Sequence, residues 1–325
     1  MGKGNLRTVA ILAICLSSLP LLVRNDYYLS VLIFIGINTI TVMGLSLLMG
    51  YAGQLSMGHA AFFGIGAYSS GVLIVKLGFS IFSAFICGIV LSAIMAMVIA
   101  IPTLKLKGHY LAVATLGFGE IINIIFNELL DVTGGPNGLS NIPYIHLWGF
   151  PLKGVAYYYL VWTIAMLLLI FSLNLIHSRI GRALRAVNGS DLAAAAMGLN
   201  VSQLKVQIFV LSAIYASVAG SLYAHFVTFI SPSSFGLFFS TLLLMMVIIG
   251  GLSSIWGALL GAGILTVLPE YLRAFKNFDI LVYGAILMVI LLFMPEGIFK
   301  GLIGSWGWIR EKWWRLRNPF LKLPT

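Results

Sequence analysis

The chain has 325 residues, of which 60% are hydrophobic and only 9% carry a charge. Because a soluble domain normally has about 25% charged residues, this composition excludes an ordinary soluble protein. The net charge of +10 does not indicate a nucleic-acid-binding protein, since the basic residues lie between and after the apolar runs, where they orient a membrane protein. The composition therefore predicts an all-α polytopic membrane protein with a single transmembrane domain, residues 1–325.

Ten apolar segments follow one another along the chain and predict about ten transmembrane or partly broken helices. They cover residues 8–23, 28–50, 60–76, 79–101, 109–130, 156–176, 206–229, 237–250, 252–269 and 280–295. The segment 237–250 is short for an upright crossing and ends at a Gly-Gly pair, so it is a candidate half-helix.

The positions of lysine and arginine predict how the segments are oriented. With the N-terminus in the cytoplasm, fourteen of these residues fall in inner loops and tails and five in outer loops. Such an excess marks the cytoplasmic side. Both termini are therefore expected in the cytoplasm and the loop 131–155 outside. The tail 300–325 combines an aromatic stripe with basic residues and is expected to lie at the inner membrane interface.

The first motif lies at residues 53–68, which read GQLSMGHAAFFGIGAY. Small residues recur at helical spacing from there on, at Ala60, Gly64, Ala67 and Gly71, and favour close helix packing. Packing does not explain the polar residues of the motif, which need partners or water in a membrane. They are candidates for lining the inner end of a transport pathway: Gln54, Ser56 and His59.

A second polar group lies within the apolar segment 109–130. Glu120 is near its middle, and Asn123 and Asn127 follow at three and seven residues on the same helical face. An ionisable group at that depth is costly and usually faces a cavity or a partner. We expect Glu120 and Asn123 to line a pathway, with a hydrogen bond between helices as the alternative.

The outer loop 131–155 contains the sequence Gly-Gly-Pro-Asn-Gly at 134–138. Glycine supplies positive φ and proline fixes a corner, so tight turns are expected. The loop is either a plain connector or a docking surface for an external partner.

A basic polar island, residues 177–205, separates two long apolar runs. It contains a short alanine-rich helix, Asp191 to Met197, that stops at Gly198. A structured helix in a cytoplasmic loop offers a surface to a soluble partner, so the island is interpreted as a cytoplasmic coupling loop. The residues expected to serve this coupling are Arg182, Arg185, Asp191, Ala193, Ala194 and Gly198.

The stretch 250–264 resembles 53–67 at a constant offset of 197 residues. The similarity is either the trace of an internal repeat or a chance result of simple composition. Gly257 and Gly261 in the second stretch also form a G-x-x-x-G packing face.

The sequence contains no pattern that predicts catalysis. The five histidines are not at metal-ligand spacing, and there is no nucleophile elbow and no phosphate-binding G-x-x-x-x-G-K-[ST] loop. We therefore expect no enzyme activity, no cofactor and no metal, and an ATP-driven mechanism would need a separate polypeptide.

Taken together, these motifs resemble a known family. The motif at 53–68 resembles the permease subunits of branched-chain amino acid ABC importers, and the sequence TGGPNG at 133–138 resembles their LivM-type subunit. The island is similar to the coupling segment of ABC importer permeases, since Ala193, Ala194, Gly198 and Ile208 stand at matching spacings. Leu192 replaces a glutamate of that pattern, and residues 210–211 replace its Leu-Pro.

The resemblance implies a permease subunit in a bacterial inner membrane with a type II-like ABC importer fold. It implies two cytoplasmic ATP-binding subunits, a sister permease and an extracytoplasmic binding protein that delivers leucine, isoleucine or valine. Two alternatives stay open at this stage: the same permease type for urea or a simple sugar, and a stand-alone channel or ion-coupled transporter. The latter would need several buried charges, and only Glu120 is well placed.

Overall fold

The computed structural model describes residues 3–23, 25–103, 106, 108–147, 150–272, 284 and 288. Most of these residues are helical. The long helices are α1 (Lys3–Leu22), α2 (Asp26–Ser46), α3 (His59–Val75), α4 (Ile81–Thr103), α5 (His109–Glu128), α7 (Val155–His177), α10 (Val201–Val227), α11 (Leu237–Gly250) and α12 (Ile255–Leu272). The shorter elements are η1 (Leu47–Tyr51), α6 (Leu130–Thr133), η2 (Gly135–Asn137), β1 (His146–Leu147), β2 (Phe150–Pro151), α8 (Arg179–Gly189), α9 (Asp191–Ala196) and η3 (Pro232–Phe235).

The long helices follow the apolar segments, and each segment predicted up to residue 269 corresponds to one of them. Among the described residues, six helical stretches are long and apolar enough to cross a membrane: Asp26–Tyr51, Ile81–Thr103, His109–Glu128, Val155–His177, Val201–Val227 and Pro232–Gly250. Three shorter apolar helices accompany them: Arg7–Leu21, His59–Val75 and Ile255–Tyr271. The chain is thus a helical multi-pass protein. Apart from Gly284 and Met288, the segment 280–295 and the tail 300–325 lie outside the described residues.

Helix α11 has 14 residues and ends at the Gly-Gly pair, so the half-helix prediction for 237–250 stays a prediction. The 3-10 turn η3 precedes α11, and the stretch Pro232–Gly250 has 19 residues, long and apolar enough to cross a membrane. A π-helical turn and a non-helical segment also separate α2 from α3, where the sequence predicts a gap between the segments 28–50 and 60–76.

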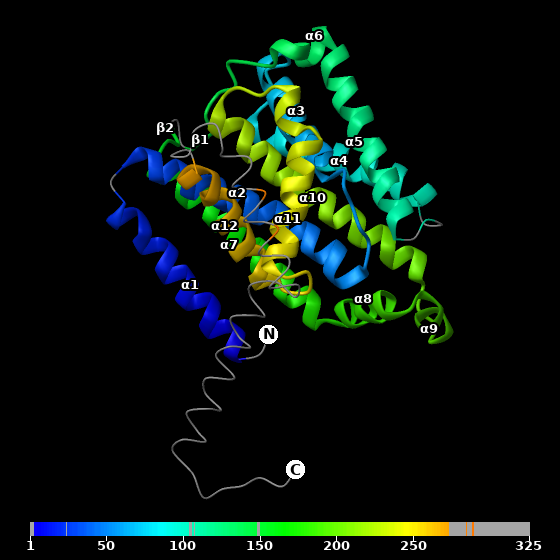
Figure 1. Ribbon diagram of the computed structural model, residues 1–325. Helices are drawn as coiled ribbons and strands as arrows, with labels where there is room; N and C mark the ends of the chain where they lie inside the picture. The colour runs from blue at the N-terminus through cyan, green and yellow to red at the C-terminus, as the bar shows by residue number, and fades with distance from the viewer. Residues whose placement is uncertain are drawn as a thin grey trace, which may run out of the picture.

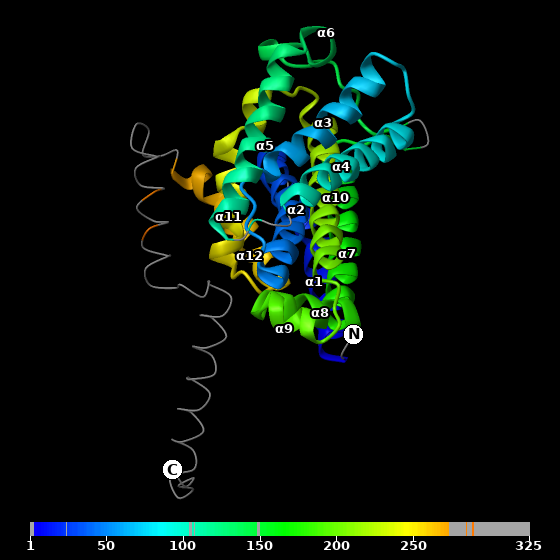
Figure 2. The ribbon, with the colours of Figure 1, turned by 90° about the vertical axis from the view of Figure 1, so that its right-hand side faces the viewer.

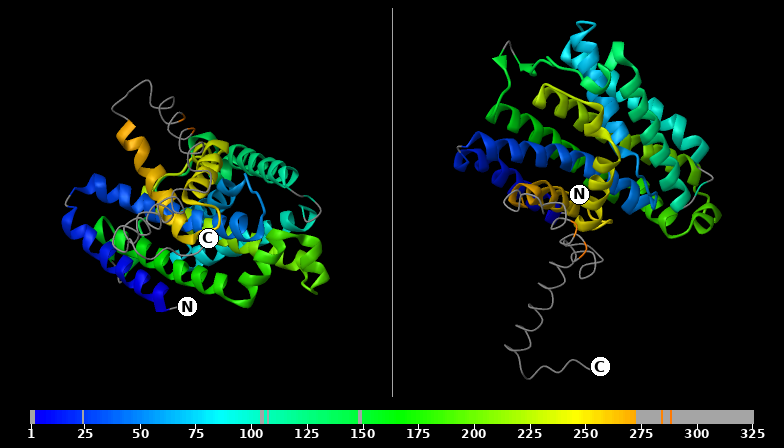
Figure 3. Two further views of the ribbon diagram at one scale, coloured as in Figure 1. Left: turned by 60° about the horizontal axis from the view of Figure 1, so that its bottom comes forward. Right: turned by 45° about the horizontal axis from the view of Figure 1, so that its top comes forward.

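Helix α10 lies in the centre of the bundle and packs against α2, α3 and α4 (Figure 1). Helices α7, α11 and α12 pack against α2. Helix α1 lies on one flank, where the Tyr158 hydroxyl donates to the Leu16 carbonyl at 2.8 Å. Helix α5 lies on the other flank, as the turned views in Figure 3 also show.

The two ends of the bundle differ. Helices α8 and α9 lie across one end, and α6 lies at the opposite end (Figure 2). Near α6, Gly134, Gly135 and Gly138 all have positive φ and form the expected turns. An isolated bridge between Leu139 and Ile230 ties this loop to the chain after α10. The loops 131–155 and 177–205, which the sequence predicts on opposite sides, thus lie at opposite ends of the bundle.

Glycines bring two pairs of helices into backbone contact. A Cβ at Gly66 would lie 2.2 Å from the Ser217 carbonyl oxygen, and one at Gly220 would lie 1.9 Å from that of Phe63. Helices α3 and α10 therefore touch through their backbones. The predicted small-residue face is not the face that makes this backbone contact. A Cβ at Gly64 or Gly71, which belong to that face, would first meet side chains.

The G-x-x-x-G face of α12 packs within the chain. A Cβ at Gly257 would lie 2.1 Å from the Gly250 oxygen, and one at Gly261 would lie 1.9 Å from the Met246 oxygen. Helices α11 and α12 are thus held closely together. The two stretches of the possible repeat run in the same direction in Figure 1, but their matched glycines do not pack alike.

Candidate functional site

The first part of the motif, residues 53–58, is a non-helical segment that interrupts the helical path between α2 and α3. The π-helical turn η1 ends α2, Gly53 follows with φ +66°, and α3 begins only at His59. A Cβ at Gly58 would lie 2.0 Å from the Thr115 carbonyl oxygen, so the segment runs directly against α5. Non-helical backbone at membrane depth is tolerated only where it is buried or lines a cavity.

Side chains from neighbouring helices satisfy the free N–H groups of this segment. The Met57 N–H donates to Thr115 Oγ1 at 3.0 Å, and the Ala60 N–H donates to Ser240 Oγ at 3.1 Å. The broken helix is therefore held by polar contacts from α5 and α11, as a break inside a membrane requires.

The three polar residues of the motif are buried. His59 Nδ1 lies 2.8 Å from Ser56 Oγ, and His59 Nε2 lies 2.6 Å from Ser212 Oγ on α10. Both ring nitrogens thus have partners, and His59 ties the start of α3 to α10. Gln54 is 7% exposed, and its Oε1 has no donor among the residues that the structure describes. Pathway lining by Gln54, Ser56 and His59 stays a prediction.

Glu120 and Asn123 diverge on α5. The Asn123 side chain donates to the Pro232 carbonyl at 3.0 Å and so connects α5 to η3. Asn127 in turn donates to Asn123 Oδ1 at 3.0 Å. Glu120 is exposed on the outer flank, and in the described part of the chain no side chain forms a salt bridge or hydrogen bond with its carboxylate.

At the other end, serines define the boundaries of the island's helices. Ser178 Oγ accepts from the Ile180 N–H at 3.1 Å and caps α8, and Ser190 Oγ accepts from the Ala193 N–H at 3.3 Å and caps α9. Gly198, with φ +81°, follows the end of α9, as predicted. The short helix expected in this loop is therefore present.

Arg182 and Arg185, both predicted to take part in coupling, donate hydrogen bonds to carbonyl groups at the C-terminal end of α7. Arg185 Nη1 donates to the Ile176 carbonyl at 3.0 Å, and Arg182 Nη1 donates to the His177 carbonyl at 3.4 Å. Cations at a helix C-terminus satisfy its last carbonyls and its dipole. These contacts fix α8 relative to α7.

Helix α9 is attached on one face and free on the other. On the attached face of α9, Ala194 is fully buried. Asp191 pairs with Lys205 of α10, with 2.7 Å between Oδ2 and Nζ. Ala193 is exposed, and the side chains of Leu192 and Met197 are 81% and 68% exposed. Leu192 on this six-residue helix and Met197 directly after it make a small apolar contact surface.

One connection was missed from the sequence. Asn188, near the end of α8, donates from Nδ2 to the Gly50 carbonyl of η1 at 3.0 Å. The same carbonyl accepts from Ser253 Oγ at 3.3 Å, and the Tyr51 hydroxyl donates to the Ser253 carbonyl at 2.9 Å. The α8–α9 end is thus joined by hydrogen bonds to the break after α2 and to the α11–α12 turn. A single asparagine before a glycine gives no sequence signal of this role.

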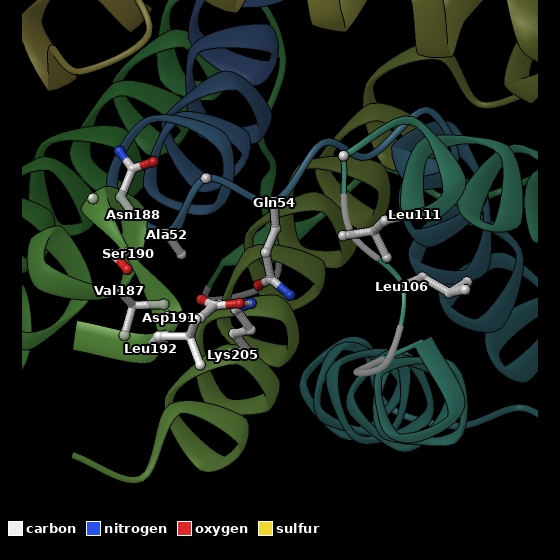
Figure 4. Close-up of a pocket in the computed structure, with 13 residues that line it drawn as sticks. Ala52, Gln54, Leu106, Leu111, Val187, Asn188, Ser190, Asp191, Leu192 and Lys205 are labelled. Atoms are coloured by element: carbon white, nitrogen blue, oxygen red, sulfur yellow. Dashed lines mark hydrogen bonds and ion pairs between the residues drawn. The ribbon is translucent and has the colours of Figure 1, made fainter. Parts of the chain in front are cut away.

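A cavity of about 290 Å³ opens between the break and the α8–α9 end. Figure 4 shows Gln54, Asp191 and Lys205 on one side and Leu106 and Leu111 on the other. No cluster of three or more His, Cys, Asp or Glu residues that could hold a metal ion occurs in the portion of the chain that the structure covers.

The comparisons with known proteins point to one family. A family model described as a branched-chain amino acid transport system permease component matches residues 27–294. The high-affinity branched-chain amino acid transport system permease protein LivM of Escherichia coli (strain K12) is 31% identical over 280 residues, which cover 79% of this chain and 66% of that protein. LivM of Salmonella typhimurium matches at the same identity and coverage.

A more distant relative is a probable branched-chain amino acid transport permease protein LivM from Methanocaldococcus jannaschii. It is 23% identical over 321 residues, which cover 84% of this chain and 93% of that protein. No solved structure matches the chain. The chain thus spans a little under two thirds of the length of the two bacterial relatives.

Proposed function

The chain belongs to the family of branched-chain amino acid transport permeases, and from this premise we propose that it is one membrane-spanning subunit of an ATP-driven importer. Its cargo would be leucine, isoleucine or valine, the substrates that the family description names as a class. The family match over residues 27–294 is the observation that carries the proposal. Recognition would rest mainly with a separate binding protein.

The energy for transport would come from a pair of cytoplasmic ATPase subunits that dock on α9. This helix lies at one end of the bundle and carries the exposed side chains of Leu192 and Met197. Isolated exposed apolar residues are common, but two of them, one on this capped six-residue helix and one at its end, favour a protein contact in a polar loop. The α8–α9 end is accordingly the cytoplasmic end, and α6 with the β1–β2 hairpin faces outward, toward the binding protein.

Movement of α9 would reach the membrane domain through buried contacts. Ala194 and the Asp191–Lys205 pair attach α9 to the bundle, and Asn188 connects α8 to the carbonyl of Gly50. A push on α9 can therefore alter the break between α2 and α3. Energy enters transport only if the ATPase contacts differ between the inward- and outward-facing states.

A sister permease would cover the outer flank of α5. This flank carries Glu120 together with exposed Val113, Ile121 and Ile124. A carboxylate facing lipid at this depth is costly, so a protein or aqueous surface has to meet it. The translocation pathway is accordingly assigned to the interface on this flank, with Glu120 in its wall.

Reconstitution tests the proposal directly. The assembly is purified by a tag on this chain and placed in proteoliposomes with ATP inside and the binding protein outside. Labelled leucine should accumulate only when both are present. Accumulation without ATP, or by this chain alone, would contradict an ATP-driven importer, and uptake of urea or a sugar in place of leucine would overturn the cargo.

A further inference from the structure

The cavity beside α9 has two chemically different walls. The polar wall contains the amide of Gln54 and the ion pair of Asp191 with Lys205, whereas the facing wall is formed by Leu106 and Leu111 (Figure 4). The volume of about 290 Å³ lies at the lower end of the range for small-molecule sites, roughly 300–1,000 Å³. The cavity is therefore of a size for one small metabolite with a polar and an apolar end.

We propose that this cavity binds a free, zwitterionic amino acid with an apolar side chain, and that its occupancy from the α8–α9 side slows import. The inference rests on the proposed function, because it makes the site a sensor of the imported product. It assigns to this chain a second amino-acid site, separate from the pathway on the flank of α5.

The ion pair supplies the recognition of both charges. The side chains of Lys205 and Asp191 are 12% and 24% exposed, so each retains an accessible edge beside the cavity. A zwitterion can lie antiparallel to such a pair, with its carboxylate near Lys205 and its ammonium near Asp191. The charges of Lys205, Asp191 and the two ends of the zwitterion then alternate in sign. They attract one another more strongly at this partly buried site than they would in bulk water.

Gln54 supplies an unused polar group at the same wall. Its side chain is more than nine-tenths buried, it lines the cavity, and Oε1 accepts no hydrogen bond within the described ranges. Buried carbonyl oxygens are normally paired. Oε1 is itself buried, so an amino-acid ammonium held at Asp191 gives this oxygen a partner once the Gln54 amide turns toward the cavity.

The apolar wall selects the side chain. Leu106 and Leu111 face the polar groups across the cavity, while Val187 and Leu192 add apolar atoms on the side of Asp191. A branched aliphatic side chain would bury its surface there, whereas glycine would leave the apolar wall uncovered. The preferred ligand class is therefore the same as the proposed cargo.

Occupancy would act on coupling because the cavity lining comes from separate segments of the proposed coupling route. Ala52, Gly53 and Gln54 come from the break after α2, and residues 187–192 come from the α8–α9 junction. A ligand that contacts both segments favours the one arrangement in which both are in place, and it shifts the equilibrium by its difference in affinity between states. Accumulated product would thus hold α9 and slow the next cycle.

The experiment uses the complete assembly in proteoliposomes loaded with ATP and with 0, low or high unlabelled leucine, while labelled leucine and binding protein are outside. Internal leucine should lower the initial uptake rate and bind saturably to the assembly in the absence of binding protein. Leu106→Trp, which fills the cavity, and Gln54→Leu, which removes the amide, should each weaken this binding by about tenfold or more. The matched control is Leu91→Trp on the exposed face of α4, which should leave inhibition unchanged.

The outcomes separate the two proposals. If wild-type liposomes do not import leucine at all, the proposed function fails. If import is normal but internal leucine neither binds nor inhibits, or if Leu106→Trp retains full inhibition, the cavity is not the sensor. Internal 4-methylpentanoate, isopentylamine and glycine each lack one recognised group and should inhibit weakly; equal inhibition by any of them would overturn the assigned ligand class.

Discussion

At the scale of single residues, the contact between α3 and α10 leaves no room for a methyl group. A Cβ at Gly66 would lie 2.2 Å from the carbonyl oxygen and 2.6 Å from the Cα of Ser217. Both are backbone atoms of a central helix, so the two helices would have to separate. Overpacking of this kind costs about 1–3 kcal/mol.

We therefore expect Gly66→Ala to lower the thermal midpoint of the purified protein and its yield as a monodisperse species. Gly117→Ala is the matched control, since a Cβ there meets no atom within 4 Å. Thermal unfolding followed by tryptophan fluorescence checks both variants. Equal midpoints for the two variants would show that α3 and α10 do not touch in this way.

Asn188 is the second residue whose role depends on one contact. Asn188→Leu keeps the number and branching of the side-chain heavy atoms but cannot donate to the Gly50 carbonyl. Loss of one hydrogen bond is worth about 0.5–1.5 kcal/mol, so leucine imported per ATP hydrolysed should fall by up to about tenfold. Parallel assays of uptake and phosphate release measure this ratio.

Gln203→Leu, an exposed change on α10, controls for added apolar surface at the same end and should keep the wild-type ratio. An unchanged ratio in Asn188→Leu would remove this contact from the coupling route.

Residue roles were only partly predictable from the sequence. The need of His59 for partners was predicted, and the partners are Ser56 and Ser212. That Asn123 contacts Pro232 on η3 was not, because the contact joins residues 109 positions apart. Periodicity places Glu120 and Asn123 on one face, but a difference of three residues is enough to turn one outward and the other inward.

At the scale of elements, α9 is the part of the chain best suited to receive a partner. Its buried residue Ala194 and its capping residue Ser190 maintain the helix, while Leu192 and Met197 contribute no packing to the bundle. Replacing both exposed side chains with alanine should therefore leave the fold intact. We expect Leu192→Ala with Met197→Ala to reduce co-purification of the ATPase subunits and leucine uptake by about tenfold or more, since buried apolar anchors dominate such contacts.

Phe150→Ala is the control for this pair, because Phe150 is equally exposed but lies in the β1–β2 hairpin. Quantitative pull-down through a tag on this chain gives the ratio of ATPase to permease. A wild-type ratio in the double variant would place the ATPase contact elsewhere.

Helices were predictable because their apolar runs are long, and α9 was predictable because its alanines end at Gly198. The gap between α2 and α3 was predicted by the separate apolar segments 28–50 and 60–76, but the π-helical turn η1 was not, since residues 47–52 are as apolar as the helix before them. The position of the gap is set by Gly53 and by contacts to α5 and α10 from distant parts of the sequence. The Gly-Gly pair does end α11 after 14 residues, and η3 extends this stretch to 19 residues, which the sequence did not indicate.

At the scale of the whole molecule, composition and charge were sufficient for the class of protein. The multi-pass helical architecture and the family resemblance predicted from residues 53–68 and 133–138 are confirmed. How helices pair was beyond the sequence, because apolar helices offer many equivalent faces. The placement of α10 at the centre and α5 on a flank follows from backbone contacts such as that of Gly220 with Phe63.

The flank of α5 carries the last prediction. If it borders an aqueous pathway rather than lipid, a cysteine at Gly117, one turn from Glu120, should react with a membrane-impermeant thiol reagent in the assembled transporter. Ile94→Cys on the exposed face of α4 is the lipid-facing control and should stay unreactive, because a charged reagent does not enter hydrocarbon. The native Cys15 and Cys87 are both exposed and are replaced by serine beforehand.

Glu120→Gln should in parallel lower leucine uptake several-fold with an unchanged thermal midpoint, since the carboxylate has no partner to lose among the described residues. Equal labelling at the two positions, together with normal uptake by Glu120→Gln, would move the pathway away from α5 and leave the carboxylate facing headgroups or lipid.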